Sequence, residues 1–84
     1  MKLKSGFIVR KIVKDTVLMD VQNTERVLRL NETAADILAL LTEGLSEEEI
    51  VARMADMYAI EKETASRDVR ATLENLRSLG AIED

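Results

Sequence analysis

The sequence contains no cysteine, histidine, proline or tryptophan, and it has one tyrosine and one phenylalanine among 84 residues. Without cysteine there is no disulfide framework and no thiolate metal site. Without histidine the chain lacks the commonest general base and the commonest metal ligand. The three glycines are too scattered to form a loop that cradles phosphates. The composition therefore favours a binding protein over an enzyme, and we expect no cofactor.

The sequence also lacks any apolar run near the ~20 residues that a membrane span needs. Basic residues at the N-terminus are not followed by the apolar segment of a signal peptide. We therefore expect a cytoplasmic protein without a membrane partner. The length of 84 residues predicts one domain over residues 1–84 with a single small core.

Charge is divided unevenly along the chain. Residues 1–30 hold seven basic and three acidic side chains, whereas residues 31–84 hold five basic and thirteen acidic ones. A basic first part suggests an acidic partner for it. The alternative is a mixed, solvated surface without a partner, and a charge count alone favours that alternative.

Three segments predict short strands: residues 7–12 (FIVRKI), 16–21 (TVLMDV) and 26–30 (RVLRL). They are joined by the turns VKD and QNTE, and Asn23 in the second turn suits a left-handed backbone position. Strands with such tight connections form an antiparallel meander, in which the third strand lies at an edge. An edge without proline invites the addition of another strand.

Three helices follow, and their ends are marked by residues that favour helix caps. The expected caps are Asn31 before the first helix, Gly44 after it, Ser46 with Glu49 as a capping box before the second, and Gly80 after the third. The third helix is predicted from about residue 61 to residue 79. The whole chain therefore predicts an α+β protein, with three strands followed by three helices.

Helical spacing also predicts the core. We expect Ile50, Met54 and either Met57 or Tyr58 to face inward from the second helix, and Ile82 to fold back onto the core. The main cluster is predicted to consist of Leu30, Ile37, Leu41, Val69, Leu73 and Leu76.

The stretch RVLRLNETAADILALL, residues 26–41, resembles the central motif of the PqqD family. That motif is a strand that ends in Leu-Asn-Glu-Thr-Ala, here residues 30–34, followed by Ile-Leu and paired leucines. The resemblance continues through Ser-x-Glu-Glu-Ile at residues 46–50, Asp-Val at 68–69 and Leu-x-x-Leu at 73–76. It runs in register from about residue 7 to residue 82, although the strands lack the tryptophan and tyrosine often seen in members of the pyrroloquinoline quinone pathway.

The resemblance implies a winged-helix-like fold that serves as a recognition element for ribosomally made, modified peptides. Such a domain is not a catalyst. It holds the leader of a precursor peptide as an added antiparallel strand, in a groove between the third strand and the third helix. It presents that peptide to a maturase, commonly a radical SAM enzyme.

This model leads to a set of expected peptide-binding residues. They are Arg26, Val27, Leu28, Arg29 and Leu30 on the third strand, and Arg70, Leu73 and Arg77 on the third helix. The two helical arginines are chosen because leaders in this family are often acidic with apolar anchors. Two alternatives stay open: Arg70 and Arg77 could pair with Glu63 or Glu74, and the opposite border of the helix (Asp68, Thr72, Asn75, Leu79) could face the strand instead.

Two other functions compete with this prediction. A winged-helix DNA-binding regulator needs a basic recognition helix. The predicted second helix begins with three glutamates and carries one arginine, which disfavours a nucleic-acid partner. A scaffold module that supports an enzyme without binding a peptide is compatible with the sequence.

Overall fold

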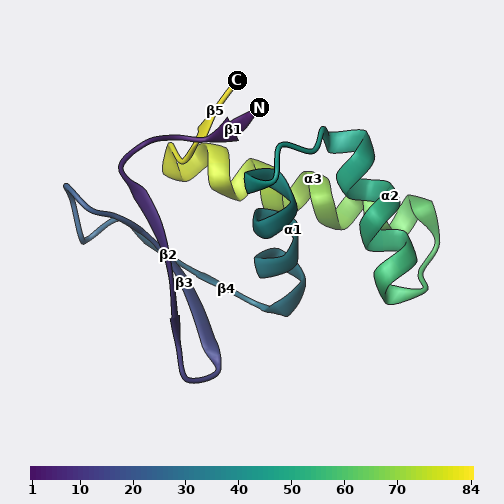
Figure 1. Ribbon diagram of the computed structural model, residues 1–84, viewed down its shortest axis with the longest axis horizontal. Coiled ribbons are helices and arrows are strands. Elements are labelled where there is room, and N and C mark those ends of the chain that lie inside the picture. Colours follow the sequence, from purple (N-terminus) through teal and green to yellow (C-terminus); the bar gives the residue numbers. More distant parts are fainter.

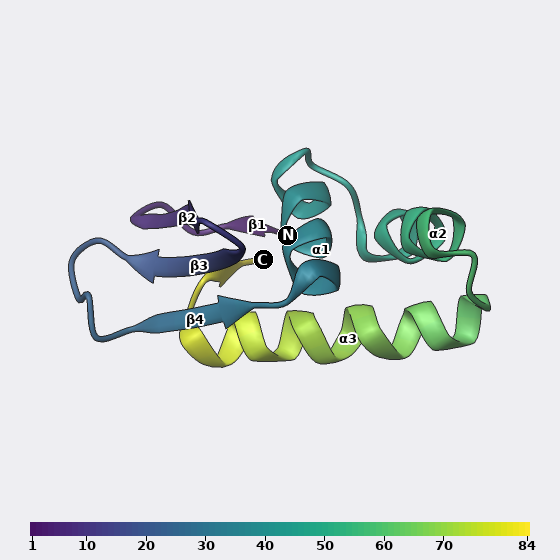
Figure 2. The ribbon, with the colours of Figure 1, turned by 90° about the horizontal axis from the view of Figure 1, so that it is seen from below.

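The computed structural model describes all 84 residues and has an α+β fold (Figure 1). In chain order the elements are β1 (Lys2–Leu3), β2 (Phe7–Ile12), β3 (Asp15–Asp20), β4 (Val27–Leu30), α1 (Glu32–Thr42), α2 (Glu47–Tyr58), α3 (Lys62–Leu79) and β5 (Ile82–Glu83). The predicted fold class is confirmed, as is the order of three main strands before three helices. Figure 2 shows α3 along the length of the molecule, with α2 beside its N-terminal half and the sheet beside its C-terminal half.

The main sheet is antiparallel, with the strand order β2-β3-β4. β3 begins and ends one residue earlier than predicted. β4 begins at Val27 rather than at Arg26, because the Arg26 N–H donates to the Asn23 carbonyl in the preceding turn, at 2.9 Å.

The two ends of the chain form a second, two-stranded sheet that the sequence did not predict. β1 pairs with β5, and Leu3 lies opposite Ile82. Two residues are too few to show the alternation that identifies a strand. Ile82 packs against the core, as predicted.

The left-handed backbone position lies in the first turn instead of the second. Val13 has φ 55°, whereas Asn23 does not have a positive φ. Asn23 instead accepts a hydrogen bond from the Glu25 N–H through its side chain, which closes the turn without a left-handed residue. A β-branched residue with positive φ is strained, so the tight β2–β3 hairpin is formed against the local preference of Val13.

β4 passes into α1 without a loop because Asn31 serves both elements. Its backbone is extended (φ −73°, ψ 177°), so it continues the strand. Its side-chain oxygen accepts from the Ala34 N–H at 2.8 Å and from the Thr33 hydroxyl at 2.9 Å, so it also caps the helix. The predicted glycine end of α1 is confirmed: Gly44, with φ 92°, directly follows the C-cap Glu43, and its N–H donates to the Leu41 carbonyl at 3.0 Å.

The other predicted caps are present. Ser46 and Glu49 form the capping box of α2, and the hydrogen bonds from Ser46 hold the pKa of Glu49 below its ordinary value. Gly80 ends α3 with φ 81°. The α2 C-cap, Ala59 with φ 51°, was not predicted.

One hydrophobic core joins the sheet to the helices. All six residues of the predicted main cluster are buried. In α2, Tyr58 is the half-buried member of the predicted Met57–Tyr58 pair, and Met57 is exposed. The complete set of buried residues is Leu18, Leu30, Ile37, Leu38, Leu40, Leu41, Ile50, Val51, Met54, Ala65, Val69, Leu73, Leu76 and Ala81.

A hydrogen bond from the Tyr58 hydroxyl to the Asp36 carboxylate joins α2 to α1. This bond, burial and the nearby charges of Asp36 and Glu32 raise the pKa of Tyr58 from 10.0 to about 12. A pKa that is raised on folding stabilises the protein below the unfolded value, and this stabilisation is lost as the pH rises through the folded value. We therefore expect the free energy of unfolding to fall between about pH 10 and pH 12.

Tyr58→Phe is the control for this titration. All other titratable groups are common to both proteins. Urea unfolding followed by circular dichroism should therefore show a steeper decline for the wild type than for Tyr58→Phe. Parallel declines would contradict the assignment.

Candidate functional site

The backbone of β4 is hydrogen-bonded on one side only. The Asp20 N–H donates to the Arg26 carbonyl at 3.1 Å, and the Val21 N–H donates to the Gly6 carbonyl at 2.9 Å. Because successive residues of a strand direct their backbone groups to opposite sides, the even-numbered residues of β3 bond to β4 and the odd-numbered ones bond to β2. By the cross-strand register, the β4 residues whose backbone groups point toward β3 are then the even-numbered ones.

Val27 and Arg29 therefore direct their N–H and C=O groups away from β3, toward the open side of the sheet. We call these two N–H and two C=O groups the β4 edge. They are spaced as in any antiparallel strand, so they match the groups that an added strand presents.

The side chains of β4 alternate between two faces. Leu28 and Leu30 point toward the core, in line with the buried Leu18. Val27 and Arg29 lie on the outer face and are exposed. The strand thus offers backbone groups at its edge, a leucine on the inner side and an arginine on the outer side.

The C-terminal half of α3 extends over the same part of the molecule as β4: the two are adjacent in the view of Figure 2 and stand apart in that of Figure 1. Arg26, just before β4, fixes this arrangement. Its guanidinium lies 3.6 Å from the Asp20 carboxylate and 5.9 Å from the centre of the Phe7 ring. It also occupies the space next to Gly80, where a Cβ would lie 2.6 Å from Nη2.

Arg26 was predicted to contact the peptide, and its side chain is 42% exposed, but it also has partners within the protein. Its carbonyl is bonded to β3, and its guanidinium is held between the sheet and the end of α3. The positive φ of Gly80 favours glycine, and the Arg26 guanidinium would have to shift if this position carried a Cβ. Arg26 therefore positions β4 relative to α3.

Arg29 is the more available of the two strand arginines. Its side chain is 74% exposed, and it pairs with Asp15 at 3.0 Å across the outer face of the sheet. An ion pair this exposed contributes little stability. The guanidinium has five N–H donors, so it can bind a second carboxylate while it keeps the first.

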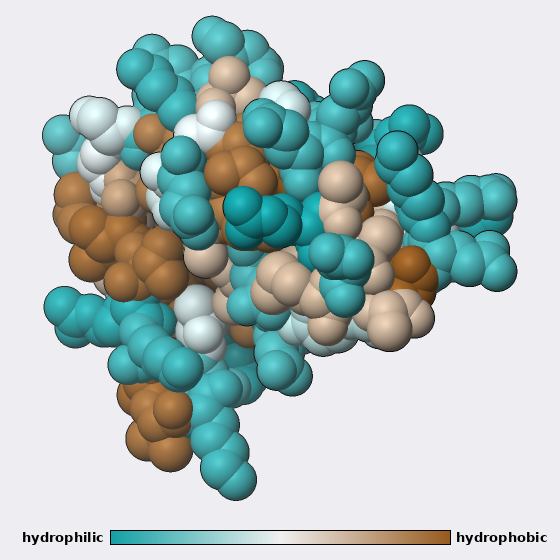
Figure 3. Space-filling view, turned by 45° about the vertical axis from the view of Figure 1, so that its right-hand side comes forward, coloured by the Kyte–Doolittle hydropathy of each residue, from teal (hydrophilic) through white to brown (hydrophobic).

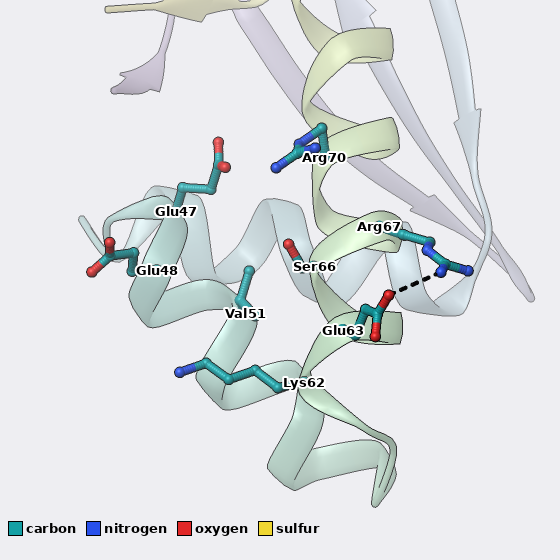
Figure 4. Close-up of a pocket in the computed structure, with 8 residues that line it drawn as sticks. All are labelled: Glu47, Glu48, Val51, Lys62, Glu63, Ser66, Arg67 and Arg70. Carbon is teal, nitrogen blue, oxygen red and sulfur yellow. Dashed lines mark hydrogen bonds and ion pairs between the residues drawn. The ribbon is translucent and has the colours of Figure 1, made fainter.

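Arg70 lies on the side of α3 that faces α2. It lines a pocket between these two helices, together with Glu47, Glu48 and Val51 of α2 (Figure 4). Glu63, in the first turn of α3, forms an ion pair with Arg67, with 3.1 Å between the Glu63 Oε1 and the Arg67 Nη2 (Figure 4). Arg70 is thus separated from β4, and it does not pair with Glu63 or Glu74.

Arg77 lies on the same border, nearer to the chain termini. Its guanidinium contacts the Asp84 carboxylate at 3.4 Å and the Met1 sulfur at 3.8 Å. In Figure 1 the β1–β5 pair and β4 lie on opposite sides of the C-terminal end of α3. The two arginines of the expected groove wall therefore lie on the border of α3 that faces α2 and the chain termini, away from β4.

The opposite border of α3 is the one beside β4. At 100° per residue it carries Asp68, Thr72, Asn75 and Leu79. Thr72 and Leu79 are half-buried, and Leu79 packs against the core. This wall is mixed polar and apolar, not basic.

Leu73 has no exposed surface. It therefore packs in the core, as predicted, and cannot be a direct contact for a ligand that docks on this structure.

Large exposed apolar side chains come mainly from the main sheet and its turns. In Figure 3 the brown areas are most extensive on the left, which is the side of the sheet in Figure 1. Only Met57 comes from a helix; the others are Ile8, Val9, Ile12, Val13, Val21 and Val27.

The fold and this edge define a class of small α+β proteins with an open strand beside a long helix. The family model for coenzyme PQQ synthesis protein D (PqqD) matches residues 15–82, which includes β3, β4 and all three helices. The chain belongs to the PqqD family. No curated protein sequence matches it.

Two solved structures have the same fold. One is described as "TbiB1 in Complex with the TbiA(beta) Leader Peptide"; it is 29% identical, with a TM-score of 0.86 over 99% of this chain and 95% of that one. The other is "Lasso peptide synthetase B1 complexed with the leader peptide"; it is 28% identical, with a TM-score of 0.86 over 99% of this chain and 96% of that one. No helix of the present chain has both the length and the apolar character required to cross a membrane.

Proposed function

We propose that this protein binds the leader of a ribosomally made precursor peptide by strand addition at the β4 edge, beside α3. The observation that carries the proposal is the pair of residues Val27 and Arg29, whose backbone groups face outward on a strand without proline. Two similar proteins, 29% and 28% identical, are described as complexes with leader peptides.

The sheet has a second open edge, on β2, and three facts favour β4. The family match begins at residue 15 and so includes β4 but not β2. The guanidinium of Arg26, just before β4, lies next to Gly80 at the end of α3. The β4 edge is also fixed to α1 through Asn31, so it is preorganised for docking, which lowers the entropic cost of binding.

The protein acts in this proposal as a carrier and not as a catalyst. It has no histidine or cysteine, and its carboxylates do not gather into a group that could hold a metal ion. Its partners are the leader peptide and the enzyme that modifies the precursor, for which the family resemblance implies a radical SAM maturase. Nucleic acid is not expected, because α2 begins with three glutamates.

Selection from a random peptide library on the immobilised protein tests the proposal. A selected peptide would then be titrated into ¹⁵N-labelled protein. We expect amide shifts at residues 27–30 and along the Thr72–Leu79 border of α3, with little change on β2 or α2. Failure to enrich peptides, or shifts centred on α2 or β2, would contradict it.

A further inference from the structure

We propose that Arg29 binds a carboxylate side chain of the bound peptide, and that the next residue of that peptide is apolar and faces α3. This inference rests on the proposed strand addition at the β4 edge. It adds a substrate pattern, which follows from the register of the sheet and from the charges around it.

The hydrogen-bond pattern fixes which peptide residues face which side. A strand added antiparallel to β4 bonds to the backbone of Val27 and Arg29, so two of its residues lie directly opposite these two. Residues that lie opposite each other in a sheet project from the same face. The peptide side chains opposite Val27 and Arg29 therefore lie on the outer face, and the one between them points inward beside Leu28.

The outer face gives these two positions different chemistry. The peptide residue opposite Arg29 lies next to an exposed guanidinium whose present partner is Asp15. The residue opposite Val27 extends a row of apolar side chains, because Ile8, Met19 and Val27 are cross-strand partners on one face. A carboxylate suits the first position and an apolar side chain suits the second.

The inner position lies between the strand and the helix. Leu28 and Leu79 are both partly buried and pack against the core, and Thr72 on the same border of α3 is half-buried. An apolar side chain placed here removes this surface from water.

The antiparallel direction sets the order of the pattern. β4 runs from Val27 to Arg29, so the peptide residue opposite Arg29 is nearer the peptide's N-terminus than the residue opposite Val27. Read from its N-terminus, the bound segment is therefore acidic, apolar, apolar. Arg29 is the candidate that supplies charge selectivity here, because Arg26 is held by Asp20 and both Arg70 and Arg77 lie on the far border of α3.

Parallel selections on the wild type and on Arg29→Glu, from the same random library, test the inference. We expect the wild type to enrich Asp or Glu directly before two apolar residues. Arg29→Glu should enrich Lys or Arg at that position, with the apolar pair unchanged. Arg77→Glu is the matched control, because it reverses an exposed arginine away from β4, and it should leave the selected pattern unchanged.

Titration calorimetry on a selected peptide then measures the effect. Replacing its acidic residue with Lys should weaken binding to the wild type about fivefold at low salt and less at high salt, as for exposed charges. The same replacement should strengthen binding to Arg29→Glu. Arg29→Lys should retain the preference for an acid.

The outcomes separate the inference from the proposed function. Peptides that bind β4 without an acidic preference, or with one that Arg29→Glu leaves intact, overturn the role of Arg29 alone. An acidic preference that is lost or reversed in Arg77→Glu also overturns it, as does an enriched pattern in the reverse order. A library from which the wild type enriches nothing overturns the proposed function itself.

Discussion

Leu41→Ala is expected to lower the free energy of unfolding by about 2–5 kcal/mol, the range for removing a buried leucine side chain. Leu41 lies on α1 and is 1% exposed, in the core formed with β4 and α3. The substitution removes three carbons from a packed interior, and the neighbouring backbone cannot close the space fully. Urea unfolding followed by circular dichroism measures the change.

Met57→Ala is the matched control, because Met57 is also a large apolar residue on a helix, but the residue is 53% exposed. Its substitution should cost less than about 1 kcal/mol. If Leu41→Ala costs no more than this control, α1 does not pack as described. The position of β4 would then also be in question, since Asn31 joins the two elements directly.

Local features of the fold could be predicted from the sequence because single residues determine them. Asn31 has the extended backbone and the side-chain oxygen that a strand-to-helix junction requires. Ser46 and Glu49 satisfy each other's backbone groups within one turn. Such interactions extend over three residues, so they do not depend on the tertiary structure.

The side of α3 that faces β4 could not be predicted in the same way. Rotation about a helix gives two borders at equal angles from the buried face, one with Arg70 and Arg77 and the other with Thr72 and Asn75. Only the packing of α2 and of the chain termini decides between them. The basic border was chosen on charge, and in the structure it faces α2 and the chain termini.

The two strand arginines show the same limit. In the predicted strand 26–30, alternation places Arg26 and Arg29 on opposite faces, but the sequence alone does not give the partners of either face. The register places Arg26 on the inner face in line with Asp20 and Phe7, where it binds within the protein, and leaves Arg29 on the outer face. The pairing of strands, which is not local, therefore gives the two arginines different partners, although the Arg26 side chain is still 42% exposed.

Val27→Pro is expected to reduce peptide affinity about tenfold or more while it leaves the fold intact. The Val27 N–H faces the open edge and takes no part in the β3–β4 ladder. Proline there removes one donor that the peptide needs and places its ring in the path of the added strand. Leu28→Pro lacks this selectivity, because the Leu28 N–H bonds to β3.

Val9→Pro on β2 is the matched control. Val9 has the same side chain, and its backbone also faces outward, but on the opposite edge of the sheet; its side chain lies on the inner face, opposite Leu18. Both variants should unfold at similar urea concentrations, and only Val27→Pro should lose affinity in calorimetric titration with a selected peptide. Should Val27→Pro prove unstable, a synthetic protein with an N-methylated Val27 amide removes the same donor without proline's ring. Equal affinity of both edge variants and the wild type would exclude strand addition at β4, and loss in Val9→Pro alone would place the peptide on β2.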